Sequence, residues 1–401
     1  MNSLRRLLGK FIKMDKNDYH AWDKQKLIER IQQLESSITA KQQQTKQPKK
    51  EFDFSKHHTR FIALKFSYLG WNYNGLAYQT HETELPTVEE TVLKALEKCK
   101  LIPSMNPNDF KFSRCGRTDK GVSAMNQVIS LNVRSNLSSE EQKDPANDFK
   151  ELNYIQTLNK LVPHDIRFKA VCLRPPKDFD ARFSCQYRHY RYFFHKDDLD
   201  IELMRLAAKK YEGEHDFRNF CKIDGSKQIH NHVRTMLSSD IVAYNEEFYY
   251  FDLQGRAFLW HQVRCMVAIL FLVGSKLEKP EIIDWLFDVT NNPRRPVYDM
   301  ANDLPLVLYD CKYKNDVEWT TMQTQDRFAY AQWLESNLKH NISSVFYDYF
   351  LSVPAVADSR TVVNVGDGKR KPVGKYIELK NRQKLETVEA QNAKFKKRKL
   401  K

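Results

Sequence analysis

The sequence lacks paired cysteines and long apolar runs. Its seven cysteines lie tens of residues apart, with no Cys-x-x-Cys pair, so neither a disulfide scaffold nor a zinc ribbon is indicated. The most apolar stretch, residues 258–273, is too short to span a membrane and contains His261, Gln262 and Arg264. No secretory signal is present. We therefore expect a soluble, intracellular protein from a reducing compartment.

Several short catalytic signatures are also missing. There is no Gly-x-Ser-x-Gly elbow, no phosphate-binding P-loop and no His-Glu-x-x-His zinc helix. Residues 366–374 are rich in glycine but lack the spacing and the Ser/Thr of a phosphate loop. Cys221, His230 and His232 are close in sequence, yet their spacing does not resemble a zinc finger. The chain therefore encodes no familiar metal or nucleotide motif.

What the sequence does have is basic charge at both ends. Its 401 residues carry a net charge of +14 and are 41% hydrophobic, which is enough for a core and leaves room for two domains with tails. Residues 1–56 sum to +6, residues 57–365 to −1 and residues 366–401 to +9. The overall balance favours a polyanionic partner, most often nucleic acid. The charge does not itself identify that partner.

Both ends have the pattern of extensions. Residues 1–14 hold four basic and no acidic side chains among apolar ones at helical spacing, typical of a mitochondrial import signal or a basic helix. Helical spacing recurs over residues 27–38, before a Gln/Lys-rich linker. After residue 316 the periodicity weakens. Residues 394–401 form a basic run typical of nuclear localisation or nucleic-acid contact.

Between the ends, strand and helix patterns alternate. Strands are predicted over residues 61–66, 128–133, 166–173, 187–194, 236–242, 248–253 and 306–311. Helices are predicted after Thr87, which forms a capping box with Glu90, over residues 152–161, 203–211 and 281–287, and from residue 259. This alternation predicts an α+β fold with mixed or antiparallel sheets.

A charged loop between two glycines is the first feature that could carry chemistry. It runs from Gly116 to Gly121 and places Asp119 between Arg117 and Lys120. Such a segment can be a solvated turn without a catalytic role. Alternatively, the neighbouring cations keep the carboxylate ionised and the tight loop presents it as a nucleophile. The loop alone leaves both interpretations open.

Aromatic and basic side chains alternate in the strand predicted over residues 187–194. On such a strand Arg188, Tyr190 and Tyr192 share one face. RNA-binding clefts use rings that stack on bases and guanidinium groups that hold phosphates. An amphipathic strand with half-buried tyrosines explains the pattern equally well.

Arg264 lies in an otherwise apolar helical segment, residues 258–273. A cation there is unfavourable unless it pairs with a carboxylate. Pairing with Asp119 would explain both residues at once. The alternative is an arginine whose head extends to the surface, which the apolar run over residues 265–273 disfavours.

Taken together, these motifs resemble the pseudouridine synthases of the TruA family. Matching features occupy residues 60–311, in the family's order: the Gly116-Arg117-Thr118-Asp119 loop, residues 181–184 with Arg188 and Tyr190, residues 213–217, residues 258–264 with Gly274, and residues 301–308. The extended motifs are similar to the eukaryotic branch that acts on positions 38 and 39 of the tRNA anticodon arm. The sequence departs from the bacterial pattern at Lys120, Ser123 and Pro305. These departures concern which branch of the family the sequence resembles.

The resemblance implies two ferredoxin-like halves joined into one mainly antiparallel sheet, with an RNA-binding catalytic cleft at the junction. We expect the halves at residues 57–178 and 179–315, a basic extension over residues 1–56, and a second over residues 316–401 that ends in a basic tail. The implied reaction converts uridine to pseudouridine in tRNA, with no metal and no organic cofactor. The implied partner is the tRNA anticodon stem–loop, bound by a homodimer without membrane contact. We expect the protein in the nucleus and cytoplasm, with a mitochondrial fraction if residues 1–14 are an import signal.

The resemblance also implies roles for single residues. Asp119 matches the nucleophile and Arg264 its ion-pair partner. Tyr190 would contact the target uracil and is a candidate base for the C5 proton, while Leu306 would form an apolar wall of the pocket. The basic residues expected to bind the RNA are Arg114, Arg117, Arg182 and Arg188, with Arg117 also helping to hold the flipped base.

Two other classes of function remain open from the sequence. A tRNA-binding or chaperone-like protein could keep the same fold without catalysis, although the presence of Asp119, Tyr190 and Arg264 together argues against it. A metal-dependent nuclease would need clustered carboxylates, and Asp119 has no acidic neighbour in its loop.

Overall fold

The structure is a computed structural model that describes residues 22–44, 52–314, 316–321, 327–351, 361–369 and 371–399. The chain divides into two compact units, Met1–Asp53 and Phe54–Lys401. In the first unit, α2 (Lys24–Gln44) confirms the helical spacing seen over residues 27–38. The candidate import segment, residues 1–14, and residues 45–50 of the linker lie outside the described residues.

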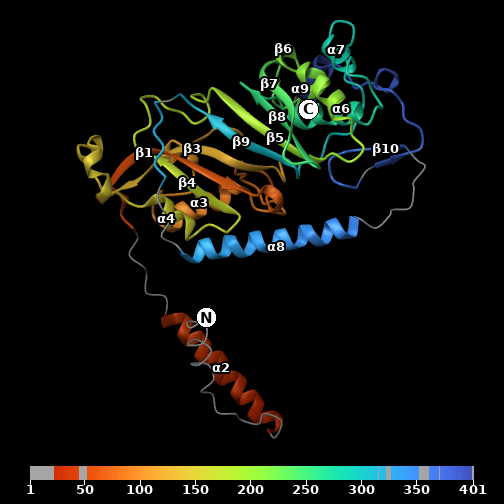
Figure 1. Ribbon diagram of the computed structural model, residues 1–401. Helices are drawn as coiled ribbons and strands as arrows, with labels where there is room; N and C mark the ends of the chain where they lie inside the picture. The colour runs from red at the N-terminus through yellow and green to blue at the C-terminus, as the bar shows by residue number, and fades with distance from the viewer. Residues whose placement is uncertain are drawn as a thin grey trace. The chain divides into compact units, whose positions relative to one another are not determined.

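A sheet of nine strands organises the second unit (Figure 1). Its order is β4-β1-β3-β9-β5-β8-β7-β6, with β2 added beside β3. The strands are β1 (His58–Tyr68), β2 (Ser113–Arg114), β3 (Ser123–Ser135), β4 (Ile166–Cys172), β5 (Tyr187–His195), β6 (Gly213–Asp216), β7 (Val233–Ala243), β8 (Phe248–Gly255) and β9 (Leu306–Lys312). All neighbours pair antiparallel except β3 and β9. The predicted α+β class and mainly antiparallel sheet are therefore confirmed.

β9 joins the two parts of this sheet. On one side it runs parallel to β3, pairing Val307 with Ser123. On the other it runs antiparallel to β5, pairing Leu308 with Tyr190. Both neighbours carry residues predicted for the site, since β5 contains Tyr190 and β3 directly follows the Asp119 loop. The central strands thus bring together motifs that are far apart in sequence.

Helices pack on the sheet through apolar faces. They are α3 (Val88–Lys98), α4 (Tyr154–Asn159), α5 (Ile201–Lys209), α6 (Gln262–Gly274) and α7 (Ile282–Phe287). The capping box at the start of α3 is present, since the Thr87 side chain accepts from Glu90 N–H and the Glu90 side chain accepts from Thr87 N–H. In α6 every residue except Arg264 is buried. Phe271 of this helix packs edge-on against Tyr192 and Phe194 of β5.

The C-terminal region contains more structure than its weak periodicity predicts. It forms α8 (Arg327–Leu351), a short β10–β11 pair (Thr361–Val363 and Lys371–Val373) and α9 (Val388–Lys399). Residues 361–399 return to the second half of the sheet and are held there by both backbone and side-chain hydrogen bonds. Leu385 N–H donates to Arg295 O at 2.8 Å, and Asn302 N–H donates to Val365 O at 2.7 Å. Hydrogen bonds of this kind do not require hydrophobic residues at regular spacing, so the sequence pattern could not predict them.

One buried carboxylate anchors this returning segment. Glu278 Oε1 accepts from Leu379 N–H at 2.6 Å and from the Tyr376 hydroxyl at 2.7 Å. The Leu379 side chain is completely buried. Residues 54–401 form one compact unit, and the division at residues 178 and 315 stays a prediction. None of the described helices is long and apolar enough to cross a membrane.

We predict that Leu379→Ala lowers the free energy of unfolding by about 2–4 kcal/mol, because it leaves a cavity under the returning segment. Urea unfolding measures this change. Leu385→Ala is the matched control, since that leucine is 38% exposed, and should cost less than about 1 kcal/mol. Equal losses in the two variants would contradict the docked position of residues 361–399.

Candidate active site

The loop that carries Asp119 connects β2 to β3 and is held by the backbone of residues 69–76. Leu76 N–H donates to Thr118 O at 3.1 Å, and Gly121 N–H donates to Tyr73 O at 3.3 Å. The Thr118 and Tyr68 hydroxyls share a buried hydrogen bond of 2.7 Å. The loop is therefore fixed on both sides of Asp119.

Glycine is required at two positions around this loop. Gly75 has φ +80°, and a Cβ there would lie 2.9 Å from Thr118 O. Gly121 also has φ +80°, and its Cβ would lie 2.1 Å from Asp303 Oδ2. A side chain at either position would combine backbone strain with a steric clash. The loop pattern of the sequence thus has a specific structural cause.

The Asp119 carboxylate is partly buried and faces the start of α6. His261 Nε2 lies 3.5 Å from Asp119 Oδ2. Burial raises the pKa of Asp119, and the nearby charge of Asp303 adds to this rise; Arg264 has the largest opposing effect and lowers it. Trp260 and Lys222 also lower this pKa. These groups favour the ionised carboxylate against the cost of burial.

The direct ion-pair partner of Arg264 is not the one that the sequence predicted. Among the described residues its ion pair is with Asp303, at 3.7 Å, and its Nε donates to Ala301 O at 2.7 Å. The predicted direct ion pair with Asp119 is therefore not formed. Asp303 provides the closer carboxylate, so Arg264 acts on Asp119 through its field. The acidic neighbour that the Asp119 loop lacks in sequence is supplied by the segment before β9.

Tyr190 and Leu306 lie on neighbouring strands beside this cluster. Tyr190 is buried on β5, with its ring edge-on to Phe258 at 4.9 Å. Burial raises the pKa of its hydroxyl, and the charge of Asp119 contributes to that rise. Leu306, at the start of β9, is also buried and pairs with Tyr192. The structure thus brings Tyr190 within electrostatic range of Asp119.

Arg188 makes contacts that the sequence did not predict. One terminal nitrogen donates to Cys115 O at 2.7 Å and to Arg182 O at 2.9 Å, and the other donates to Arg256 O at 2.8 Å. The guanidinium group therefore holds three backbone segments around the site. These bonds occupy three of the N–H donors that we expected to contact RNA, and a role in substrate binding stays a prediction.

The remaining arginines divide into paired and exposed groups. Arg114 forms an ion pair with Glu89, whose side chain is almost fully buried. Burial raises the pKa of Glu89 to about 7, opposed chiefly by Arg114. Arg117 and Arg182 are exposed, and the Arg182 guanidinium lies 5.2 Å from the ring of Phe183. Arg117 and Arg182 are thus the ones placed to meet a polyanion.

Sequence reasoning missed several neighbours of Asp119. His261 and Trp260 stand in the motif that drew attention to Arg264, and Asp303 lies in the segment before β9. The polar residues beside the apolar helical segment were a signal in the sequence. That signal did not show which residues lie next to Asp119 in the folded chain. Cysteines 115, 185 and 311, distant in sequence, also interact behind the loop. All seven cysteines are free thiols.

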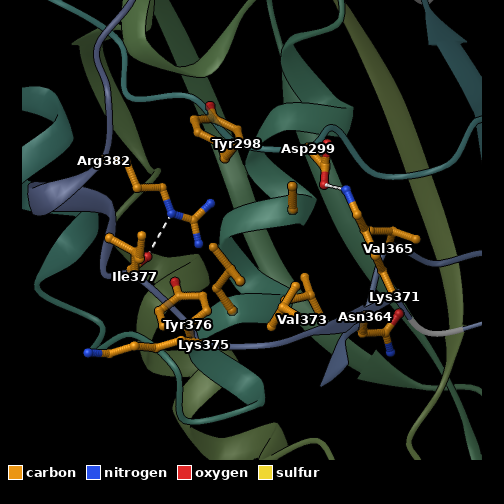
Figure 2. A pocket seen from close by; sticks show the side chains of 13 residues that line it. Tyr298, Asp299, Asn364, Val365, Lys371, Val373, Lys375, Tyr376, Ile377 and Arg382 are labelled. Carbon is orange, nitrogen blue, oxygen red and sulfur yellow. Dashed lines mark hydrogen bonds and ion pairs between the residues drawn. The ribbon is translucent and has the colours of Figure 1, made fainter. Parts of the chain in front are cut away.

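Two cavities lie on the second half of the unit. One, of about 200 Å³, is enclosed by α6 and the returning segment (Figure 2). Arg382 donates to Ile377 O at 2.7 Å there, and Lys371 pairs with Asp299 at 2.5 Å. It shares no residue with the predicted site. The other, of about 210 Å³, includes Trp260 in its lining.

No grouping of three or more His, Cys, Asp or Glu side chains suited to a metal ion occurs within the described ranges. The clustered carboxylates that a metal-dependent nuclease needs are therefore not found in that part of the chain.

Comparison with known proteins supplies independent information. Residues 207–314 match a family model described as tRNA pseudouridine synthase. This match does not reach the Asp119 loop.

A relative from Saccharomyces cerevisiae, named tRNA pseudouridine(38/39) synthase, is 51% identical over 99% of this chain and 98% of its own length. A human relative of the same name is 42% identical over 78% of this chain and 71% of its own. A relative from Methanothrix thermoacetophila, named tRNA pseudouridine synthase A, is 34% identical over 67% of this chain and 87% of its own.

Proposed function

The chain belongs to the tRNA pseudouridine synthase family, and we propose that it converts uridine to pseudouridine at positions 38 and 39 of the tRNA anticodon arm, with Asp119 as nucleophile. The main support for this reaction is the similarity, over 99% of the chain, to a relative named tRNA pseudouridine(38/39) synthase. The position of Asp119 supports its role, because a partly buried carboxylate faces a histidine and two cations.

The reaction needs an ionised carboxylate and a uridine outside the helical stack. The C1′–N1 bond breaks, the uracil turns and C1′ bonds to C5; the C5 proton is lost and N1 gains one, so the change is an isomerisation. The Asp119 carboxylate could add to C6 or to C1′, or assist deprotonation at C2′. Flipping the target out costs a few kcal/mol. Stacking on aromatic side chains and phosphate contacts from Arg117 and Arg182 would offset this cost.

Tyr190 suits contact with the uracil better than removal of a proton. Its raised pKa favours the protonated phenol, which can donate a hydrogen bond to a carbonyl oxygen of the base. Its buried ring, edge-on to Phe258, fixes the direction of the hydroxyl. Leu306 would close the apolar side of the pocket.

We expect Asp119→Asn to reduce pseudouridine formation by at least about a thousandfold, since the amide is not a nucleophile. Position-resolved pseudouridine mapping on purified tRNA measures the product, while Kd for tRNA and the melting temperature should stay near wild type. Asp299→Asn is the matched control, because that exposed carboxylate pairs with Lys371 at the surface and, among the residues that the structure describes, with no other cation.

A normal rate in Asp119→Asn would exclude Asp119 as nucleophile. A wild-type protein that binds tRNA but makes no pseudouridine in any tRNA would instead favour the non-catalytic binding protein of the same fold.

We also propose that the protein acts as a homodimer, and exposed apolar side chains on α8 support this. The large exposed ones are Leu334, Leu338, Ile342, Val345, Phe346, Tyr347 and Phe350. Together they present roughly 700 Å² of apolar surface at about 100 Å² each, more than a typical monomer leaves in one patch. A standard interface buries about 800 Å² on each partner, so a second copy of α8 would match this area.

Introducing charged side chains on the exposed face of α8 should separate the subunits. Wild-type protein should have twice the 47.5 kDa chain mass by light scattering after size exclusion, and the double variant Leu338→Glu/Ile342→Glu should have the chain mass. Asn337→Glu adds a charge at an exposed polar position and should remain dimeric. A monomeric wild type at tens of micromolar would exclude the homodimer, and a dimeric double variant would exclude α8 as its interface.

We further propose that the protein works in the nucleus and cytoplasm, with a mitochondrial fraction directed by residues 1–14. The basic end of α9 supports the nuclear part and would add sequence-independent affinity for tRNA. Lys396→Gln/Lys397→Gln/Arg398→Gln should reduce the nuclear fraction in microscopy and flatten the salt dependence of tRNA binding by about 0.9 per lost phosphate contact. Turnover at saturating tRNA should not change; a collapse there would contradict a peripheral role.

A further inference from the structure

Trp260 links the Asp119 site to the second cavity. Its side chain is 46% exposed, although it lies beside the fully buried interior of α6. Its ring centroid lies 4.4 Å from that of His261, with an angle of 30° between the rings. His261 in turn contacts Asp119 at 3.5 Å. One exposed aromatic ring therefore rests on the residue that contacts the proposed nucleophile.

The cations that line the cavity beside Trp260 differ in whether a neighbouring group offsets their charge. Arg218 is bound by Asp216 at 2.7 Å, and the Arg295 guanidinium lies 4.0 Å from the ring of Tyr298. Lys222 is exposed, and in the described part of the chain its ammonium makes no ion pair or hydrogen bond. Lys222 N–H donates to Trp260 O at 3.1 Å, which fixes the two residues side by side.

The single acidic residue in this lining does not neutralise Lys222. Glu386 pairs with Lys394 of α9. The cavity therefore combines an exposed indole ring with an unpaired ammonium group. Proteins that bind single-stranded RNA use this combination, with the ring under a base and the cation at its phosphate.

His261 has a backbone conformation that favours contact with Asp119. It precedes α6 with φ +60°, in the left-handed region that non-glycine residues rarely adopt. Burial lowers the pKa of His261 to about 4, and the cations Arg264, Lys222 and Arg295 contribute. The imidazole is therefore neutral at physiological pH, and a proton on Nε2 would point at the Asp119 carboxylate.

We propose that Trp260 is a nucleotide-stacking and positioning residue for this reaction: a base next to the flipped uridine stacks on its exposed ring, that nucleotide's phosphate meets Lys222, and the indole packs against His261, which contacts the Asp119 carboxylate. This proposal rests on the proposed function. It assigns the second cavity to the RNA strand that adjoins the target.

Substitutions can separate the two roles of Trp260. Trp260→Phe keeps a ring for stacking but gives His261 a smaller surface to pack against, so kcat should fall about tenfold with KM unchanged. Its acid limb should move to higher pH, because the indole of Trp260 lowers the pKa of Asp119. Trp260→Ala removes the ring as well, and KM and the Kd for an anticodon stem–loop should also rise at least about fivefold. Lys222→Gln should raise KM, because it removes the proposed contact with the phosphate.

Trp333→Ala, on α8, is the control for loss of a tryptophan elsewhere in the chain. Quenching of tryptophan fluorescence by the stem–loop gives a readout besides activity: the part due to stacking should vanish in Trp260→Phe and persist in Trp333→Ala. If Trp260→Ala binds and reacts within twofold of wild type, the proposal is wrong while the proposed function stands. If wild type makes no pseudouridine, the proposed function fails, and quenching lost in Trp260→Phe would still support stacking.

Discussion

The contacts of one guanidinium group hold the site together. Arg188 lies on the central strand β5, and it donates to carbonyl groups of the Asp119 loop, of the turn at Arg182 and of the chain after β8. A partly buried cation bound by three carbonyl groups keeps all three hydrogen bonds only when all three segments are in place. The loop geometry, the junction of the two halves and the exit of β8 therefore depend on one another. Gly75 and Gly121 permit the close backbone approach that completes this arrangement.

The distribution of charge follows from the same packing. The central region has a net charge of −1, yet it must accept a polyanion if the proposed function holds. Ion pairs account for much of the charge in the central region. Several arginines there are neutralised by acidic partners, at Glu89, Asp252, Asp216 and Asp303. Among the predicted site residues, Arg117 and Arg182 remain exposed. Affinity for RNA would thus come from the placement of a few charges rather than from their sum.

Local signals predicted much of this molecule. The capping box at Thr87, the alternating strands and the charged loop each appear where expected, because they depend on neighbours in sequence. Contacts across the sheet were not predictable. Arg264 needs a carboxylate, but only tertiary structure shows that Asp303 is closer than Asp119. The returning segment is held by backbone hydrogen bonds and isolated buried side chains such as Leu379, which produce no periodic pattern.

The buried helix α6 explains how a carboxylate can remain reactive in a partly apolar site. Because all its residues except Arg264 are buried, the helix cannot shift without losing its packing. Arg264 lies in its first turn, and Trp260 and His261 directly precede it, so the packing of the helix also fixes these three residues. The amino-terminal end of a helix also carries partial positive charge, which favours a nearby anion. Burial raises the pKa of Asp119, and Arg264 and Trp260 at the fixed helix end oppose that rise, which makes a nucleophilic role physically reasonable.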